Sequence, residues 1–384
     1  MDYPLQPDAP GGRFVDSGAN GGDQGTVVRA QQMNALHDEI INVIRASGQE
    51  PDANNVEQLR EALSVLGGSA RTNSVINGGF QVWQRGIAHD VTNQPVYTAD
   101  RWEVQADGAN GSGTGRVSQQ KDASAPARLK GRWDYMRYEQ QNNSTAGGAA
   151  IRTKLEVLPK LSGQRLTLSF LAMVQAPMEI AVELSRVINS VPVVVSSEQF
   201  SISQAWEQHS MSFTLENVGP LDPDADPPYL QIEFQLPDID GNAFELSGVQ
   251  LEIGDSPSGF APRPFSEEHD LCRRYYQTSG QHPTELDTPG STPSNLFRRA
   301  SIYASAQSST QFAAERLNPE MRAIPTVTYT HLLSPGFVSW GGVTRSVIGA
   351  TLVHKDSIGI PTVAGGAPTS RADCLFRWTA DAEI

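Results

Sequence analysis

Two stretches near the N-terminus carry apolar residues at helical spacing. The first predicts a helix over residues 30–47, followed by Gly48 as its C-cap. The second begins after Pro51, where Asn54 and Glu57 have the spacing of a capping box. The apolar positions are Met33, Leu36, Ile40 and Val43 in the first stretch, and Val56, Leu59, Leu63 and Leu66 in the second.

Each apolar stripe covers only about two heptads, fewer than a coiled coil requires. Two packings remain open: a helical hairpin closed on itself, and a short bundle formed between subunits. The intersubunit bundle is favoured, because such narrow stripes bury little surface in a monomer. The preceding residues 1–25 are rich in Gly, Asp and Asn, which predicts an extended arm.

From residue 71 the pattern changes to alternation of apolar and polar residues, which is typical of half-buried strands. Turn residues separate the segments at the spacing of a β-sandwich. A short polar helix is expected at 267–276, and a loop rich in Pro, Gly, Ser and Thr follows at 283–295. The strands expected before this helix lie at 132–140, 165–174, 178–187, 191–197, 229–236 and 242–254.

The last part of the chain is again strand-like, in the segments NLFRRASIYASA, PTVTYTHLL, GFVSWGG, SVIGATLVHK and DCLFRWTA. We therefore predict a mainly β protein of three parts. These are an arm with two short helices (1–70), a jelly-roll β-sandwich (71–266) and a distal β-domain (267–384). The 34 Gly and 25 Pro residues agree with many short strands joined by turns.

Charge restricts the classes of partner. The chain has 29 Lys and Arg against 43 Asp and Glu, a net charge of −14. Nucleic acid and anionic membranes would repel it, so neither is an expected partner. We expect no signal peptide and no membrane-spanning segment, since no uncharged apolar run approaches about 20 residues.

The two cysteines, Cys272 and Cys374, lie too far apart in the sequence for a CxxC zinc site. A single long-range disulfide remains open, but two reduced core cysteines are favoured. Reduced thiols fit a protein assembled in a bacterial cytoplasm.

Several segments resemble the proteins of bacteriophage tail fibres and tail tips that contain a carbohydrate-binding-type jelly roll. The first two are INGGFQVWQRG at 76–86 and YTADRW at 97–102. The jelly roll would end with FELSGVQLEIGDSPSGFAPRPFSEEHDLCRRYYQ at 244–277. NPEMRAIPTVT at 318–328 and the ending WTADAEI are similar to the distal domain of such fibres. TVVRAQQMNALHDEIINVIRASG at 26–48 is similar to the helix after their virion-anchoring arm.

The resemblance implies a non-enzymatic virion protein that docks to other tail or baseplate proteins through its N-terminal region. It further implies a homotrimer that contacts a polysaccharide or protein of the host surface, with 267–384 as the candidate receptor-binding part. Two alternatives remain: a purely structural tail or baseplate decoration, and a polysaccharide-degrading tailspike. The long solenoid repeats of a depolymerising tailspike are absent from the sequence.

A candidate glycan-binding face lies on the strand at 132–140. A glycan site requires an aromatic platform beside polar groups. Met136 and Tyr138 occupy the opposite face of this strand, which we assign to the core. We likewise assign Trp83 and Trp102 to core packing. The candidate ligand-binding residues are Trp133, Tyr135, Arg137 and Glu139.

The segment LDPDADPPYLQIE holds three aspartates that are candidate calcium ligands: Asp222, Asp224 and Asp226. It is not an EF-hand, because Pro227 stands where that loop needs a glycine. Related jelly rolls imply a calcium site after the first-strand Gly-Phe and in the last strand. In this chain Gln81 and Ser247–Gly248 occupy those positions, and none of them has a carboxylate. We therefore predict no cofactor, and calcium bound by the three aspartates is the one candidate left to test.

The segment Gly254-Asp255-Ser256 imitates the nucleophile block of an SGNH-type hydrolase. That chemistry needs a histidine base oriented by an aspartate, in a late D-x-x-H arrangement. None of the seven histidines has an aspartate three positions before it. The sequence therefore predicts no catalytic residues.

Overall fold

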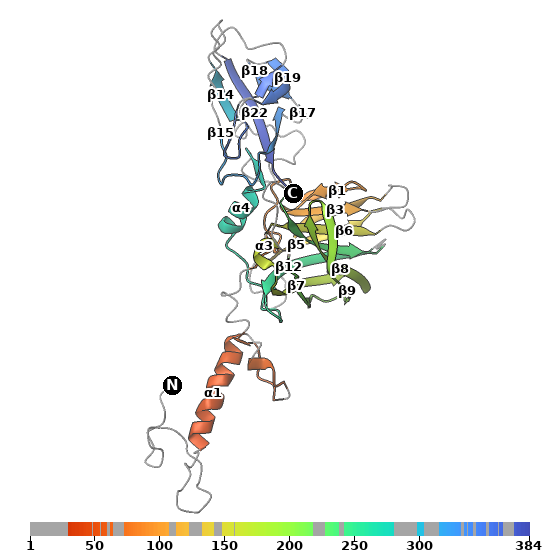
Figure 1. Cartoon of the computed structure of the whole chain (residues 1–384), viewed down its shortest axis with the longest axis vertical. Helices are drawn as coiled ribbons and strands as arrows, with labels where there is room; N and C mark the ends of the chain where they lie inside the picture. Colours follow the sequence, from red (N-terminus) through yellow and green to blue (C-terminus); the bar gives the residue numbers. More distant parts are fainter. Residues whose placement is uncertain are drawn as a thin grey trace, which may run out of the picture. The chain divides into compact units, whose positions relative to one another are not determined.

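In a computed structural model, the chain divides into two compact units, Met1–Ala70 and Arg71–Ile384 (Figure 1). The described residues are 30–47, 49–53, 55–59, 62–63, 73–106, 113–122, 133–141, 148–156, 158–217, 227–237, 242–279, 298–302, 315–331, 334–335, 337–340, 343–350, 353–359, 361–363 and 372–384.

The N-terminal unit contains the first predicted helix, α1 (Ala30–Ala46). Its apolar stripe is only partly covered: Ile44 is buried, whereas Met33 and Leu36 are 42% and 44% exposed. Residues 58–59 and 62–63 are helical, but Val56, the first apolar position of the second stripe, lies in a turn and is 90% exposed, so this helix starts later than predicted. Ahead of them the Asn55 Oδ1 accepts a hydrogen bond from the Glu57 N–H, whereas the expected cap Asn54 lies outside the described residues.

The second unit is built around eight consecutive strands. Sheet A contains them in the order β5-β12-β7-β10, and sheet B in the order β6-β11-β8-β9. If these eight strands are numbered 1 to 8 along the chain, sheet A has the order 1-8-3-6 and sheet B the order 2-7-4-5. This strand order is the double Greek key of a jelly roll. The strands are β5 (Trp133–Gln140), β6 (Ala149–Leu155), β7 (Arg165–Val174), β8 (Met178–Ile188), β9 (Val191–Ile202), β10 (Glu207–Thr214), β11 (Tyr229–Leu236) and β12 (Ala243–Ile253).

Four strands that precede the jelly roll extend the same two sheets. β1 (Ala88–Val91) and β4 (Gly115–Asp122) continue sheet A beside β5, in the order β1-β4-β5. β2 (Val96–Tyr97) and β3 (Trp102–Ala106) continue sheet B beside β6, in the order β2-β3-β6. Every described pairing in the two sheets is antiparallel.

The core lies between the two sheets. The ring of Phe170 on β7 in sheet A lies edge-on to that of Phe234 on β11 in sheet B, 5.0 Å between centroids. Trp102, the first residue of β3, also packs on Phe234. The side chains of Trp102 and Trp83 are at most 2% exposed. The assignment of both tryptophans to the core is therefore confirmed. Such aromatic packing carries much of the apolar area that stabilises a sandwich.

The six strands expected from alternation are present, with ends that differ by a few residues. The structure adds β1 to β4, β6 and β10, which the sequence analysis did not predict, and a single helical turn, α3 (Leu158–Leu161). α3 has two buried leucines three residues apart, too short a pattern to be recognised. β4 was missed because it has one buried apolar residue, Val117, among polar ones.

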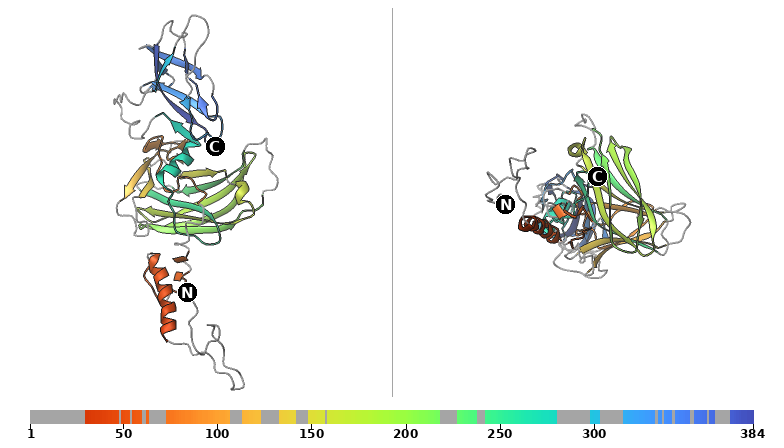
Figure 2. Two further views of the ribbon diagram at one scale, coloured as in Figure 1. Left: turned by 90° about the vertical axis from the view of Figure 1, so that its left-hand side faces the viewer. Right: turned by 90° about the horizontal axis from the view of Figure 1, so that it is seen from below.

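Helix α4 (Phe265–Arg273) follows the sandwich, where a helix at 267–276 was predicted. It lies between the sandwich and a third sheet (Figures 1 and 2) and spans the predicted boundary at 266/267. Inside α4, Glu268 is buried and accepts hydrogen bonds from the Asn77 N–H and from Arg263. The helix is thus attached to the start of the sandwich.

The third sheet is centred on one long strand, β22 (Ala372–Asp381). Along its length β22 pairs with different neighbours, all antiparallel. The other strands of this C-terminal sheet are β13 (Tyr276–Thr278), β14 (Arg298–Ile302), β16 (Thr326–His331), β17 (Ser334–Pro335), β18 (Phe337–Trp340), β19 (Val343–Ala350) and β21 (Pro361–Val363). A separate pair is formed by β15 (Glu315–Arg316) and β20 (Ser357–Ile358).

Candidate functional site

Strand β5 presents the candidate residues on the outer face of sheet A. Met136 and Tyr138 are fully buried in the core, while Tyr135, Arg137 and Glu139 alternate with them and are half-buried. The core-facing and outward-facing sides of β5 are therefore those predicted from the alternation of residues along the strand. The backbone of Trp133 belongs to β5, but its side chain lies outside the described residues.

Tyr135 forms an aromatic pair with Trp206, a residue that the sequence analysis did not single out. The ring centroids are 5.4 Å apart and the planes meet at 76°. Trp206 directly precedes β10, and β12 and β7 lie between β5 and β10 in the sheet. Strands are about 4.8 Å apart, so the two side chains must lean toward each other across the intervening strands.

The register of the strands shows what lies between the two rings. Glu245 on β12 pairs with Arg137 on one side and with Met173 of β7 on the other. Two residues further along β12, on the same outer face of sheet A, Ser247 is opposite Leu171 of β7. Leu171 and Met173 are half-buried, so the surface below the aromatic pair is partly apolar.

A charged group borders this apolar surface. Arg137 forms ion pairs with Glu139 at 2.6 Å and with Glu245 at 2.9 Å. Burial alone would lower the pKa of Arg137, but the hydrogen bond and charge of Glu139, with the charge of Glu245, raise it above its ordinary value. The guanidinium is therefore held charged and in a fixed orientation. Tyr135, Trp206, Arg137, Glu139 and Glu245 together are called the aromatic face below.

The calcium candidates Asp222, Asp224 and Asp226 lie outside the described residues. Related jelly rolls would place a calcium ligand at Ser247–Gly248 in the last strand. Here the Ser247 hydroxyl donates to the Asp134 backbone carbonyl. Gly248 has a φ of 58° and lies at a bulge in β12. Among the described residues there is no group of three or more His, Cys, Asp or Glu side chains that would hold a metal ion.

Gly254-Asp255-Ser256 forms the turn after β12. The Gly254 N–H donates to the Arg165 carbonyl, and the Gly254 and Asp255 carbonyls accept from Thr167 and Ser212. These contacts give the segment a structural role at the end of the sheet. Cys272 is a buried free thiol, and burial raises its pKa well above the ordinary value; the side chain of Cys374 is not among those described.

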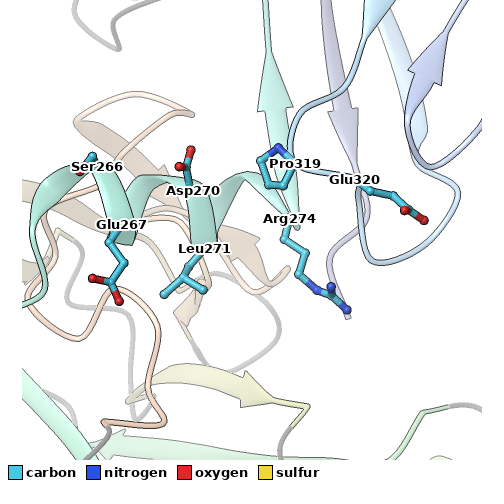
Figure 3. A pocket seen from close by; sticks show the side chains of 7 residues that line it. All are labelled: Ser266, Glu267, Asp270, Leu271, Arg274, Pro319 and Glu320. Atoms are coloured by element: carbon cyan, nitrogen blue, oxygen red, sulfur yellow. The ribbon is translucent and has the colours of Figure 1, made fainter.

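A shallow hollow of about 490 Å³ lies between α4 and the loop at Pro319–Glu320 (Figure 3). Three acidic side chains line it beside Arg274. Figure 3 shows Glu267 and Asp270 pointing in different directions. A ligand site usually has convergent polar groups, so this hollow is a weaker candidate than the aromatic face. No described helix is long and apolar enough to cross a membrane.

No family model matches the chain, and no curated protein matches it. Among solved structures, it is similar to TmCBM61 in complex with β-1,4-galactotriose, at 12% identity and a TM-score of 0.30 over 48% of this chain and 99% of that one. The family 11 carbohydrate-binding module from Clostridium thermocellum has 12% identity and a TM-score of 0.27 over 44% and 97%. Tailspike protein 4 of bacteriophage CBA120 has 13% identity and a TM-score of 0.31 over 47% and 21%.

These likenesses carry no inference about a ligand at such low identity and TM-score. The strand order of this chain itself defines the class of fold, a jelly-roll β-sandwich with an additional C-terminal sheet.

Proposed function

We propose that this protein is a non-enzymatic attachment subunit of a bacteriophage tail fibre or tail tip, which binds host-surface glycans through the aromatic face. The observation that carries the proposal is the Tyr135–Trp206 pair beside Arg137. A sugar ring has an apolar face, which packs on aromatic side chains, and hydroxyl groups at its rim. These hydroxyls require donors and acceptors close to the aromatic rings.

Arg137, Glu139 and Glu245 supply both kinds of polar group. The guanidinium is a donor only, and the carboxylates are acceptors only. Because Arg137 is fixed between two carboxylates, little side-chain entropy is lost when a ligand binds. This arrangement fits a weak, reversible glycan contact, which gains strength when several copies act together.

The phage-tail part of the proposal rests on the segments at 76–86, 97–102 and 244–277 and on the exposed apolar stripe of α1. In this proposal α1 forms a trimeric bundle, and the N-terminal region docks to other tail or baseplate proteins. The virion is then the site of action. No transfer or hydrolysis step is part of the function.

Trp206→Ala is the experiment that tests the aromatic face. A loss of about 1 to 3 kcal/mol of binding free energy is expected, so binding of purified protein to host cells weakens about 5- to 150-fold. Val193→Ala is the control, because Val193 is 45% exposed on β9 of the opposite sheet. Equal binding by the Trp206→Ala variant and the wild type, with both folded by circular dichroism, would reject the site.

A further inference from the structure

Sheet B has a polar outer face of its own, opposite the aromatic face of sheet A. We propose that this face binds a second neutral, hydroxyl-rich chain, centred on Arg152, Glu233 and Glu183. The proposal does not need the Tyr135–Trp206 pair. It would make the sandwich a two-sided glycan-binding module.

Charged side chains form a row across four neighbouring strands. Glu103 of β3 is opposite Arg152 of β6, Arg152 is opposite Glu233 of β11, and Glu233 is opposite Glu183 of β8. Arg152 forms ion pairs with Glu233 at 2.7 Å and with Glu103 at 3.5 Å. Neighbouring strands are about 4.8 Å apart, so the row offers one polar side chain at each such step. An extended glycan offers hydroxyl groups at a comparable repeat.

The row contains an unfavourable pair. Glu233 and Glu183 are directly opposite each other, and like charges in this position destabilise a sheet. Arg152 lies on the other side of Glu233, and Glu183 accepts a hydrogen bond from the Ser185 hydroxyl at 2.9 Å. Side-chain pairs that cost stability are typical of functional positions. Hydroxyl donors of a ligand would stabilise both carboxylates at once.

Amide side chains surround the central carboxylate. Gln231 and Gln235 donate to the two Glu233 oxygens at 3.1 and 3.2 Å, and Gln105 accepts from Arg152 at 2.7 Å. The Gln105 amide also donates to the Asn93 carbonyl at 3.0 Å, whereas Gln231 and Gln235 use only their N–H groups in these contacts. A hydroxyl is both donor and acceptor, so adjacent amide and carboxylate groups fit it in either role.

The side chains of this network are held in place. Arg152, Glu103 and Glu233 are only 18%, 14% and 15% exposed, although they face outward. Lys154, two residues after Arg152 on β6, forms an ion pair with Glu103 and lies over the Tyr229 ring, 5.7 Å from its centroid. Such pre-organisation lowers the entropic cost of binding.

The charge balance selects the class of ligand. Glu103, Glu183 and Glu233 exceed the two cations Arg152 and Lys154, so an acidic polysaccharide would be repelled. A metal ion is also disfavoured, because the described residues hold no group of three or more metal-binding side chains. A neutral polyhydroxylated chain has no such conflict.

Glu183→Ala is a sharp test, because this variant removes the repulsion and should leave the fold at least as stable as the wild type. Loss of binding would then not result from unfolding. Glu198→Ala is the matched control: Glu198 is an exposed glutamate on β9, opposite Val182 and outside the row. Both variants are made in full-length chain that also carries Trp206→Ala, so that the aromatic face does not contribute.

The probes are neutral gluco-, galacto- and manno-oligosaccharides, with titration calorimetry and hydrogen exchange as the measurements. We expect slower exchange in β6, β11 and β8, and an affinity about tenfold lower in Glu183→Ala but not in Glu198→Ala. Equal affinity in both variants, or protection confined to β5, β12, β7 and β10 in the wild type, overturns this inference and leaves the aromatic face intact. No binding of any probe by the wild type overturns both sites.

Discussion

Arg101 and Glu383 form an ion pair although they are 282 positions apart in the sequence. Arg101 directly precedes β3 of sheet B, and its side chain is 2% exposed; Glu383 follows β22, and its side chain is 5% exposed. The Arg101 guanidinium lies over the Tyr275 ring, 3.5 Å from its centroid. The pair therefore joins the sandwich to the C-terminal sheet within the second unit.

Arg85 reinforces this junction. It lies 3.2 Å from Asp381, 3.3 Å from Glu383 and 3.5 Å from Asp100, and it stacks on the Tyr276 ring at 3.7 Å. Arg85 belongs to INGGFQVWQRG (76–86) and Arg101 to YTADRW (97–102), two of the segments that resemble tail proteins. The structure gives both arginines a role at this junction.

Arg101→Ala should destabilise the second unit strongly. The change leaves Glu383 buried without its main cation, which typically costs about 3–5 kcal/mol of unfolding free energy. Urea denaturation followed by tryptophan fluorescence measures the effect. Arg116→Ala is the control, since Arg116 is 45% exposed in its pair with Asp90 and should cost less than about 1 kcal/mol. Equal losses in the two variants would contradict the role of the junction.

Asp100 should make stability depend on pH. Burial raises its pKa from 3.8 to about 6, although the charge of Arg85 opposes this shift. The folded form then binds more protons than the unfolded form between about pH 4 and 6. The contribution of Asp100 to the free energy of unfolding is therefore fully present below pH 4 and is lost as the pH rises through 6. The total change is about 3 kcal/mol.

The measurement compares the melting temperatures of the wild type and Asp100→Asn from pH 4 to 7. The stability of the wild type relative to the variant should fall across this window. Asp90→Asn, at an exposed position, serves as the control and should show no such trend. A constant difference between wild type and Asp100→Asn at every pH would contradict the prediction.

Gly78 should be far less tolerant of alanine than its neighbour Gly79. A Cβ on Gly78 would lie 2.0 Å from the Val249 carbonyl oxygen, which is backbone, and the Gly78 carbonyl accepts a hydrogen bond from the Val249 N–H. A Cβ on Gly79 would meet only the end of the Phe260 side chain at 3.3 Å, a contact that a shift of a few tenths of an ångström relieves. Thermal unfolding should show a loss of several degrees for Gly78→Ala alone. Equal melting temperatures in the two variants would exclude the backbone conflict.

Local pattern was sufficient for part of the fold. β7, β11 and β12 have enough apolar residues at regular spacing to be found from the sequence, and the orientation of β5 followed from Met136 and Tyr138. β10, EQHSMSFT, was missed because only Met211 and Phe213 are buried in it.

The candidate site was harder to predict for a different reason. Tyr135 was proposed from its own strand, but its partner Trp206 reaches it across two strands that come from other parts of the chain. The same holds for Arg101 and Glu383, and for the row from Glu103 to Glu183 on sheet B. These contacts depend on strand order and register, which the alternation within one strand does not contain.

The apolar stripe of α1 leads to the prediction of oligomeric state. Met33 and Leu36 are 42% and 44% exposed, so their surface would be covered if three copies of α1 formed a bundle. Light scattering of the purified protein should then give about three times 41.5 kDa. Met33→Asp with Leu36→Asp should yield monomers, because three copies would bury carboxylates in the bundle without partners.

The control for this change is Asn34→Asp, which adds a carboxylate to an exposed position of the same helix outside the stripe. It should remain trimeric, since its side chain stays in water in a bundle formed through the stripe. The exposed stripe has little effect on the fold of a single chain, so circular dichroism should be the same for all variants. A monomeric wild type, or a trimer that survives both aspartates, would show that α1 does not join the subunits.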